Sequence, residues 1–325
     1  MNLKLTEDQI SVAETADQFL AKALPSSHLR ALAADETGSA IDEPTWRRCA
    51  ELGWLGLGVP EAAGGVGMGV PEQVMLFREL GRHLAPGPFL ACTLGVHLAV
   101  VADDGKLAAD IMTGRRRVGM ALGAKGVDVG PDDLLLTVSS AGAALAEVRL
   151  WQSAKSIDPG VRLAKVAPGR EVVAVAGAQY LDRARVLIAA QLLGIVEAVR
   201  DDSAQHARTR TQFGKPIGSF QAVKHRCADM VVAAYSTIGE VFQAAVLVEQ
   251  RRDDASFHAA CAYVLASRAA RASTADHIQN LGAIGFTWEH DAHLYLKRAF
   301  VLERLLGHPR TALAAVLEPA RHEFE

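Results

Sequence analysis

The segment from Arg208 to Gln221 has the residue types of an anion-binding loop. Arg208 and Arg210 end one long helical pattern, a Gly/Pro loop follows, and a second pattern starts near Phe220. Arginines beside a helix N-terminus suit a phosphate or pyrophosphate, because guanidinium groups and free backbone N–H groups both donate to its oxygens. The same arginines would also complement the dipole of the preceding helix in a simple helix–helix connection. The residues leave both interpretations open.

A second unusual segment runs from Gln279 to His293, Gln-Asn-Leu-Gly-Ala-Ile-Gly-Phe-Thr-Trp-Glu-His-Asp-Ala-His. A helix is expected to end at Gly282. The glycines of this segment would let a flat or charged ligand approach the backbone. His290 and His293 can share one helix face, but no third ligand is spaced with them. The sequence therefore predicts no metal site.

Several other chemistries are disfavoured. The glycine-rich run Gly64–Gly69 lacks GxGxxG spacing and a preceding strand, so it is interpreted as a turn. No GxSxG elbow and no Cys/His pair stands out. The net charge is −3 and basic residues interleave with acidic ones, which disfavours nucleic-acid binding. The four cysteines are scattered without a CxxC pair, as expected in a reducing cytoplasm.

The elements that must position these segments are mostly helical. The 325 residues are 50% apolar and only 6% aromatic, which favours a helix-rich fold. Residues 1–112 are expected to form a helical domain with a first helix capped by Thr6. Further helices are predicted there at Pro44–Leu52, at Pro71–Leu84 and up to Ala102. The apolar stretches Pro88–Ala102 and Val186–Val199 are too short to span a membrane, so no membrane association is expected.

The rest of the chain changes character twice. Residues 113–180 are predicted to form a small β-domain, because short apolar runs are separated there by turn residues. The runs are Arg117–Leu122, Leu134–Val138, Val148–Trp151 and Val172–Val175. Residues 181–325 are predicted to form a four-helix bundle, because apolar residues recur at steps of three and four. Its helices are expected at Asp182–Thr209, Phe220–Val248, Ala255–Leu281 and Asp291–Leu306.

The two unusual segments together resemble the acyl-CoA dehydrogenase family of flavoproteins. One match is Arg210-x-Gln-Phe-Gly-Lys-Pro-Ile-x-x-Phe-Gln221, followed by Ala228-Asp229-Met230. The other runs from Gly282 to Ala299, and Val59-Pro-Glu-x-x-Gly-Gly-x-Gly agrees in the N-terminal zone. The resemblance covers essentially the whole chain. It implies a mainly α fold with a reduced middle β-domain, between an N-terminal helical domain and a C-terminal four-helix bundle.

The resemblance also implies FAD as cofactor and oxidation of an acyl-CoA thioester to its 2,3-enoyl form. In that chemistry a carboxylate removes the proton α to the thioester, and the flavin accepts hydride from the β-carbon. The two family positions for the glutamate correspond here to Leu306 and Ala184, and neither side chain can abstract a proton. Glu303 is the substitute candidate, one helical turn before Leu306.

Some other features of the family are missing from this chain, and others are retained. The loop that embraces the flavin ring in family members is missing after Leu122, and the chain is short for the family mainly in the β-domain. In the family, a set of residues reaches across a dimer interface to the pyrophosphate and adenosine of a neighbouring subunit's FAD. That set is retained as Arg210, Gln212, Phe213, Gln221, Gln279, Asn280, Leu281, Gly282 and Ala283.

These departures predict the base-less subunit of a heteromeric acyl-CoA dehydrogenase, an α2β2 tetramer with a homologous catalytic subunit. The resemblance is to actinobacterial enzymes that oxidise steroid side-chain CoA thioesters, and the family's electron acceptor is commonly an electron-transferring flavoprotein. Two alternatives stay open. One is a self-sufficient homo-oligomeric dehydrogenase that uses a displaced base such as Glu303, and the other is an assembly subunit that binds no flavin.

Overall fold

Helices make up the N-terminal part of the computed structural model, which describes residues 4–33 and 39–322. Their bounds are α1 Glu7–Ala23, α2 Ser26–Leu32, α3 Glu43–Glu51, α4 Val70–Arg82, α5 Phe89–Val101 and α6 Gly105–Met112. Thr6 caps α1 as predicted, because its side chain accepts from the Gln9 N–H while the Gln9 side chain accepts from the Thr6 N–H. The sequence analysis missed α2 and α6, which are too short to show a helical period.

The middle segment forms a closed barrel of five strands, in the order β1-β2-β5-β4-β3. The strands are β1 Val118–Leu122, β2 Lys125–Val127, β3 Leu134–Val138, β4 Gly142–Ala154 and β5 Leu163–Ala176. Parallel pairing of β1 with β3 closes the barrel, and irregularities between Leu145 and Leu150 bend the long β4–β5 hairpin around it. The four predicted runs fall in β1, β3, β4 and β5, whereas the three-residue β2 has no period to recognise.

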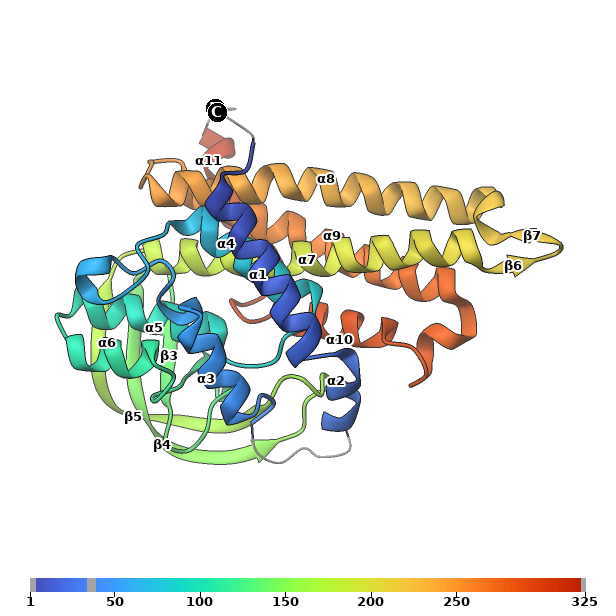
Figure 1. The fold of residues 1–325 in the computed structure, drawn as a ribbon. Helices are drawn as coiled ribbons and strands as arrows, with labels where there is room; N and C mark the ends of the chain where they lie inside the picture. The colour runs from blue at the N-terminus through green and yellow to red at the C-terminus, as the bar shows by residue number, and fades with distance from the viewer. Residues whose placement is uncertain (1–3, 34–38, 323–325) are drawn as a thin grey trace.

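The C-terminal part is a helical bundle with a small hairpin at one end (Figure 1). Its elements are α7 Gln179–Thr209, β6 Thr211–Gln212, β7 Lys215–Pro216, α8 Gln221–Glu249, α9 Ala255–Leu281, α10 Ala292–Leu302 and α11 Pro309–His322. In Figure 1, α7, α8 and α9 run alongside one another, and the β6–β7 hairpin projects beyond them. Of the apolar residues that recur at steps of three and four in α8, Ala234, Val241 and Ala245 are buried, whereas Val231 is 39% exposed.

One helix boundary was predicted wrongly. The fourth bundle helix was expected to reach Leu306, but α10 ends at Leu302 and the chain turns before α11. Gly307 has a φ of +89°, in the left-handed region that glycine tolerates. Leu306 therefore lies in a turn after the helix. Glu303 is the C-cap residue of α10, so Glu303 and Leu306 do not lie one turn apart on the same helix as predicted.

The N-terminal helices and the bundle share one core through α4 and α7. A Cβ added to Gly81 would lie 1.9 Å from the Gln191 backbone oxygen, so the two helices touch through their backbones there. Arg78 of α4 also donates from Nη2 to Glu197 of α7 at 2.9 Å. The largest cluster of buried apolar residues extends from these helices into the barrel. The domain boundaries at residues 112 and 180 stay predictions.

Candidate active site

Ala184 and Leu306, the positions that the resemblance assigns to the family's glutamate, lie on segments that interact with one buried tyrosine, Tyr263 of α9. Its hydroxyl donates to the backbone oxygen of Glu303 at 2.7 Å and lies 3.2 Å from that of Gly307, so it holds the turn that contains Leu306. On the other side, Ala184 is completely buried in α7, and its neighbour Arg185 interacts electrostatically with Tyr263. Burial raises the pKa of Tyr263 well above its ordinary value, so the hydroxyl is a neutral donor.

The sequence analysis missed Tyr263. A bulky aromatic residue in an otherwise alanine-rich helix was the available signal, but the residue's partners lie 40 and 44 positions away along the chain. Only the packing of α9 against the turn after α10 brings them together.

Glu303, the substitute base candidate, is buried but already paired. Its Oε1 lies 3.4 Å from Arg304 Nε and 3.9 Å from Arg271 Nη1. Both arginines are exposed, so the carboxylate is directed toward the bundle surface. Glu303 does not line the cavity that lies between the N-terminal helices, the barrel, α7 and α10.

That cavity lies where the N-terminal helices, the barrel, α7 and α10 meet. Its volume is about 50 Å³, enough for a few water molecules and far below the roughly 300 Å³ of a small ligand site. Arg298 is ion-paired with Asp158 and donates from Nη1 to the Ala85 oxygen at 2.9 Å. Asp128 lines the same cavity, and burial raises its pKa to about 6. This cavity is too small for a flavin ring, whereas a pocket of about 400 Å³ that shares Gly87, Pro88 and Asp128 with it lies between the N-terminal region and the barrel.

A larger and polar pocket of about 650 Å³ opens at the start of α7. Arg183 lines it and donates from Nη1 to His97 Nε2 at 2.7 Å and to the side-chain oxygen of Gln73 at 2.9 Å. Burial lowers the pKa of His97 to about 3, so the ring is a neutral acceptor. The lining also includes the exposed Arg251 and Arg252, and it is suited to a polar or charged ligand.

The residues predicted for the FAD tail gather at one end of the bundle. Arg226 of α8, five residues after Gln221, contacts the second segment, since its Nη1 lies 3.5 Å from the Asn280 side-chain oxygen. Phe213 is 88% exposed at the tip of the β6–β7 hairpin, with a φ of +51°. Most of the set is exposed: Arg210, Gln212, Phe213, Gln221, Gln279, Gly282 and Ala283.

Two members of the set behave differently. Asn280 is 6% exposed and its side-chain nitrogen lies 3.8 Å from Cys227 Sγ, while Leu281 packs in a small apolar cluster with Ile278 and Ala292. These two side chains hold the turn in place, whereas the exposed ones are free to contact another molecule.

The fold and the order of these regions define an acyl-CoA dehydrogenase. The acyl-CoA dehydrogenase N-terminal domain matches residues 6–106, and the acyl-CoA dehydrogenase C-terminal domain matches residues 173–316. The chain belongs to this oxidoreductase family.

Relatives of similar length exist within the family. Acyl-CoA dehydrogenase IpdE2 of Mycobacterium tuberculosis is 33% identical over 311 residues, which cover 94% of this chain and 95% of the relative. Acyl-CoA dehydrogenase FadE34 of the same organism is 34% identical over 290 residues, covering 81% of this chain and 40% of the relative. Among solved structures, the ChsE4–ChsE5 complex from M. tuberculosis has a TM-score of 0.82 at 25% identity, over 97% of this chain and 98% of that one.

Proposed function

We propose that this chain is the subunit without a catalytic base in a heteromeric, FAD-dependent acyl-CoA dehydrogenase, assembled with a homologous catalytic subunit as an α2β2 tetramer. The proposal depends on Ala184 and Leu306, which stand at the two positions that the resemblance assigns to the family's glutamate. Neither side chain can take the α-proton of an acyl-CoA thioester, so the carboxylate must come from the partner. The proposed reaction is oxidation of the thioester to its 2,3-enoyl form.

The exposed residues at the bundle end fit the tail of an FAD that another chain holds. When bound, FAD supplies the hydride acceptor. Arg210 offers charged donors to a pyrophosphate. Phe213 makes one T-shaped contact among the ring pairs of the described residues, with Phe220 at a centroid distance of 6.1 Å, and its 88% exposure leaves most of the ring open to a further partner. The missing loop after Leu122 agrees with a flavin-ring pocket supplied by the partner.

One face of α8 supports a partner surface. This helix is long and apolar enough to cross a membrane, but its other side packs against α7 and α9, so we interpret it as a bundle helix. Its apolar window is only 33% buried. The exposed large apolar residues of α8 are Val231, Val232 and Tyr235. An exposed apolar stripe of this kind is typical of a protein interface.

The substrate, acceptor and compartment complete the proposal. The ChsE4–ChsE5 complex is heteromeric, which supports a partner chain here. The sequence resemblance to steroid-degrading enzymes favours a steroid side-chain CoA thioester and an electron-transferring flavoprotein as acceptor. The steroid enzyme Tcur3481–Tcur3483 shares the fold, with a TM-score of 0.84 at 23% identity over 98% of this chain and 99% of that one. All four cysteines are free thiols, in keeping with a reducing cytoplasm.

Co-expression tests the proposal. We expect the chain alone to be colourless and inactive, and the complex with a homologue that retains the glutamate to carry FAD and reduce an electron acceptor with an acyl-CoA. If the chain alone is yellow and active, the proposal is wrong. In that case Glu303→Gln tests the self-sufficient alternative, because unchanged turnover in this variant would show that Glu303 is not the base.

The FAD content of the complex distinguishes this proposal from the alternative of an assembly subunit that binds no flavin. We expect Arg210→Ala with Gln279→Ala to lower the FAD content of the complex. Arg268→Ala is the matched control, because it removes an exposed arginine of α9 that is outside the retained set. Full FAD retention in the double variant would contradict the proposed contact.

A further inference from the structure

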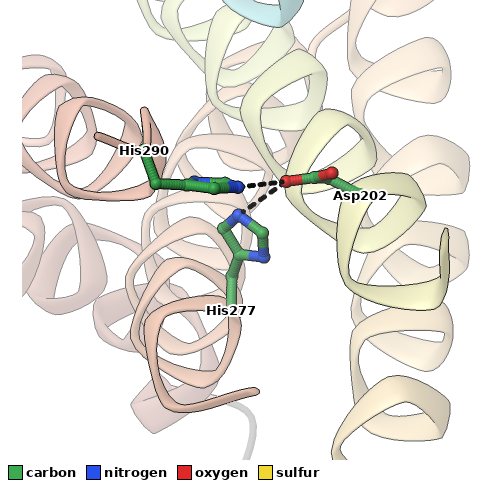
Figure 2. A group of neighbouring side chains, drawn as sticks. All are labelled: Asp202, His277 and His290. Carbon is green, nitrogen blue, oxygen red and sulfur yellow. Dashed lines mark ion pairs between the residues drawn. The ribbon is translucent and has the colours of Figure 1, made fainter. Parts of the chain in front are cut away.

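Three side chains that commonly bind metal ions meet near the bundle end, from three separate elements. Asp202 lies in α7, His277 lies near the end of α9, and His290 lies in the turn before α10. Asp202 Oδ2 is 3.2 Å from His277 Nε2 and 3.5 Å from His290 Nε2, and one ligand atom from each residue lies within 4.8 Å of the other two. Figure 2 shows both rings directed at the same carboxylate oxygen.

The His277 ring is buried with one nitrogen unsatisfied. It is 1% exposed, and its Nδ1 lies 2.7 Å from the hydroxyl oxygen of Ser203, which is completely buried. Its Nε2 makes no hydrogen bond to any residue that the structure describes, although Asp202 is close. When the neutral ring carries its proton on Nδ1, the lone pair of Nε2 faces the carboxylate. In this tautomer Nε2 can bind a metal ion beside the carboxylate, whereas in the other tautomer it faces Asp202 as an N–H donor.

The surroundings favour a cation at this point. The Asp202 carboxylate is the group that both imidazole rings face (Figure 2). Asp202 is half exposed, which leaves water a route to a further coordination position.

The two short distances match those between ligands on a tetrahedral ion. Metal–ligand bonds of about 2.0 Å at tetrahedral angles separate ligand atoms by about 3.3 Å. The observed 3.2 and 3.5 Å lie on either side of this value. The contact from Ser203 to Nδ1 is the kind of second interaction that orients a ligating imidazole.

We propose that Asp202, His277 and His290 form a binding site for a divalent first-row transition metal of the zinc type, with water in the remaining position. Two imidazoles and one carboxylate suit Zn²⁺ far better than Mg²⁺, which prefers oxygen ligands and keeps its waters. The bound ion would tie α7, α9 and the start of α10 together beside the Gln279–Ala283 turn.

One local contact changes on binding. His290 Nδ1 accepts from the Ala292 N–H at 3.2 Å, which places the ring proton on Nε2. Coordination through Nε2 moves this proton to Nδ1 and releases the Ala292 N–H. That amide is the first of α10, where backbone N–H groups have no partner inside the helix and water can replace one.

The site could not be found from spacing, and the sequence analysis predicted none. It paired His290 with His293, but the structure packs His293 edge-on against Trp288, with ring centroids 4.6 Å apart. The residues that join His290 are 13 and 88 positions away in the sequence.

Metal titration of the full chain tests the proposal without reference to activity or flavin. After removal of bound metal with a chelator, we expect calorimetry to show one Zn²⁺ bound per chain and no Mg²⁺ binding. Asp202→Asn and His290→Gln change partly exposed residues, and each should weaken Zn²⁺ binding roughly 100-fold while the circular dichroism spectrum is kept. His308→Gln is the matched control, because it removes an exposed histidine outside the site.

Bound Co²⁺ supplies a direct readout of the ligands. Its visible absorption should indicate tetrahedral nitrogen and oxygen coordination in the wild type and in His308→Gln, and should be lost in His290→Gln. The proposal is overturned if the wild type binds no Zn²⁺, or if Asp202→Asn and His290→Gln both bind Zn²⁺ as tightly as the wild type.

Discussion

A single hydroxyl, that of Tyr263, contacts two backbone oxygens of the turn after α10. In Tyr263→Phe the buried Glu303 oxygen loses its donor, and we expect the free energy of unfolding to fall by about 1–2 kcal/mol. Urea denaturation of the full chain measures the change. Tyr235→Phe is the matched control, because Tyr235 is exposed on α8 and should give almost no change. Equal stability of the two variants would show that the hydroxyl does not hold the turn.

A second residue-scale prediction concerns Asp128. Burial raises its pKa to about 6, although the Arg162 N–H donates to its Oδ1 at 2.8 Å. An acid with a raised pKa in the folded state binds its proton more tightly when folded, so its contribution to stability falls as pH rises from 3.8 to about 6. Asp128→Asn keeps an acceptor and removes this titration.

We therefore expect Asp128→Asn to gain stability relative to the wild type between about pH 4 and pH 7, by on the order of 2 kcal/mol. Urea denaturation at the two pH values measures the gain. Asp132→Asn, an exposed carboxylate in the same loop, is the control substitution. A difference between Asp128→Asn and the wild type that is the same at both pH values would contradict the assigned pKa shift.

At the scale of elements, the sequence predicted what local periodicity and capping determine. The bounds Ala255–Leu281 of α9 were predicted correctly, because Asp254 and Gly282 punctuate a long helical pattern. Three-residue β2 was missed, and α10 was predicted too long, because the turn at Gly307 depends on Tyr263 from another helix. The retained FAD-tail positions were found by resemblance, whereas the clustering around Asp202 depends on how α7, α9 and α10 pack.

The exposed face of α8 carries a prediction at the same scale. Val232 and Tyr235 are 67% and 69% exposed and lie three residues apart on one face. We expect the double variant Val232→Asp/Tyr235→Asp to keep its helical circular dichroism but to lose assembly with the catalytic partner, because charges would be buried in an apolar interface. Light scattering after size exclusion measures the assembly.

Leu150→Asp is the control for that experiment, because it places a charge on a comparably exposed apolar position of β4, in the barrel. We expect its complex to stay intact. If the α8 variant also assembles normally, another surface of the bundle must contact the partner.

At the scale of the whole molecule, one buried ion pair joins all three regions. Arg298 of α10 pairs with Asp158, in the connection between β4 and β5, and donates to the Ala85 oxygen in the N-terminal region. Both charged side chains are almost fully buried, and the Gly160 N–H also donates to Asp158 at 2.8 Å. The pair therefore couples the bundle, the barrel and the N-terminal helices at the point where their cavity lies.

Arg298→Met leaves the Asp158 carboxylate buried without its partner, and we expect it to lower the free energy of unfolding by about 3–5 kcal/mol. Replacing both partners, in Arg298→Met/Asp158→Leu, should recover part of this loss, because no unpaired charge remains buried. Arg170→Met is the matched control: it breaks the exposed pair with Glu147 and should change stability little, because water screens that pair. Urea denaturation measures the free energy of unfolding of the three variants. If Arg298→Met is as mild as Arg170→Met, or if the double variant is less stable than Arg298→Met alone, the three regions are held together by apolar packing and not by this ion pair.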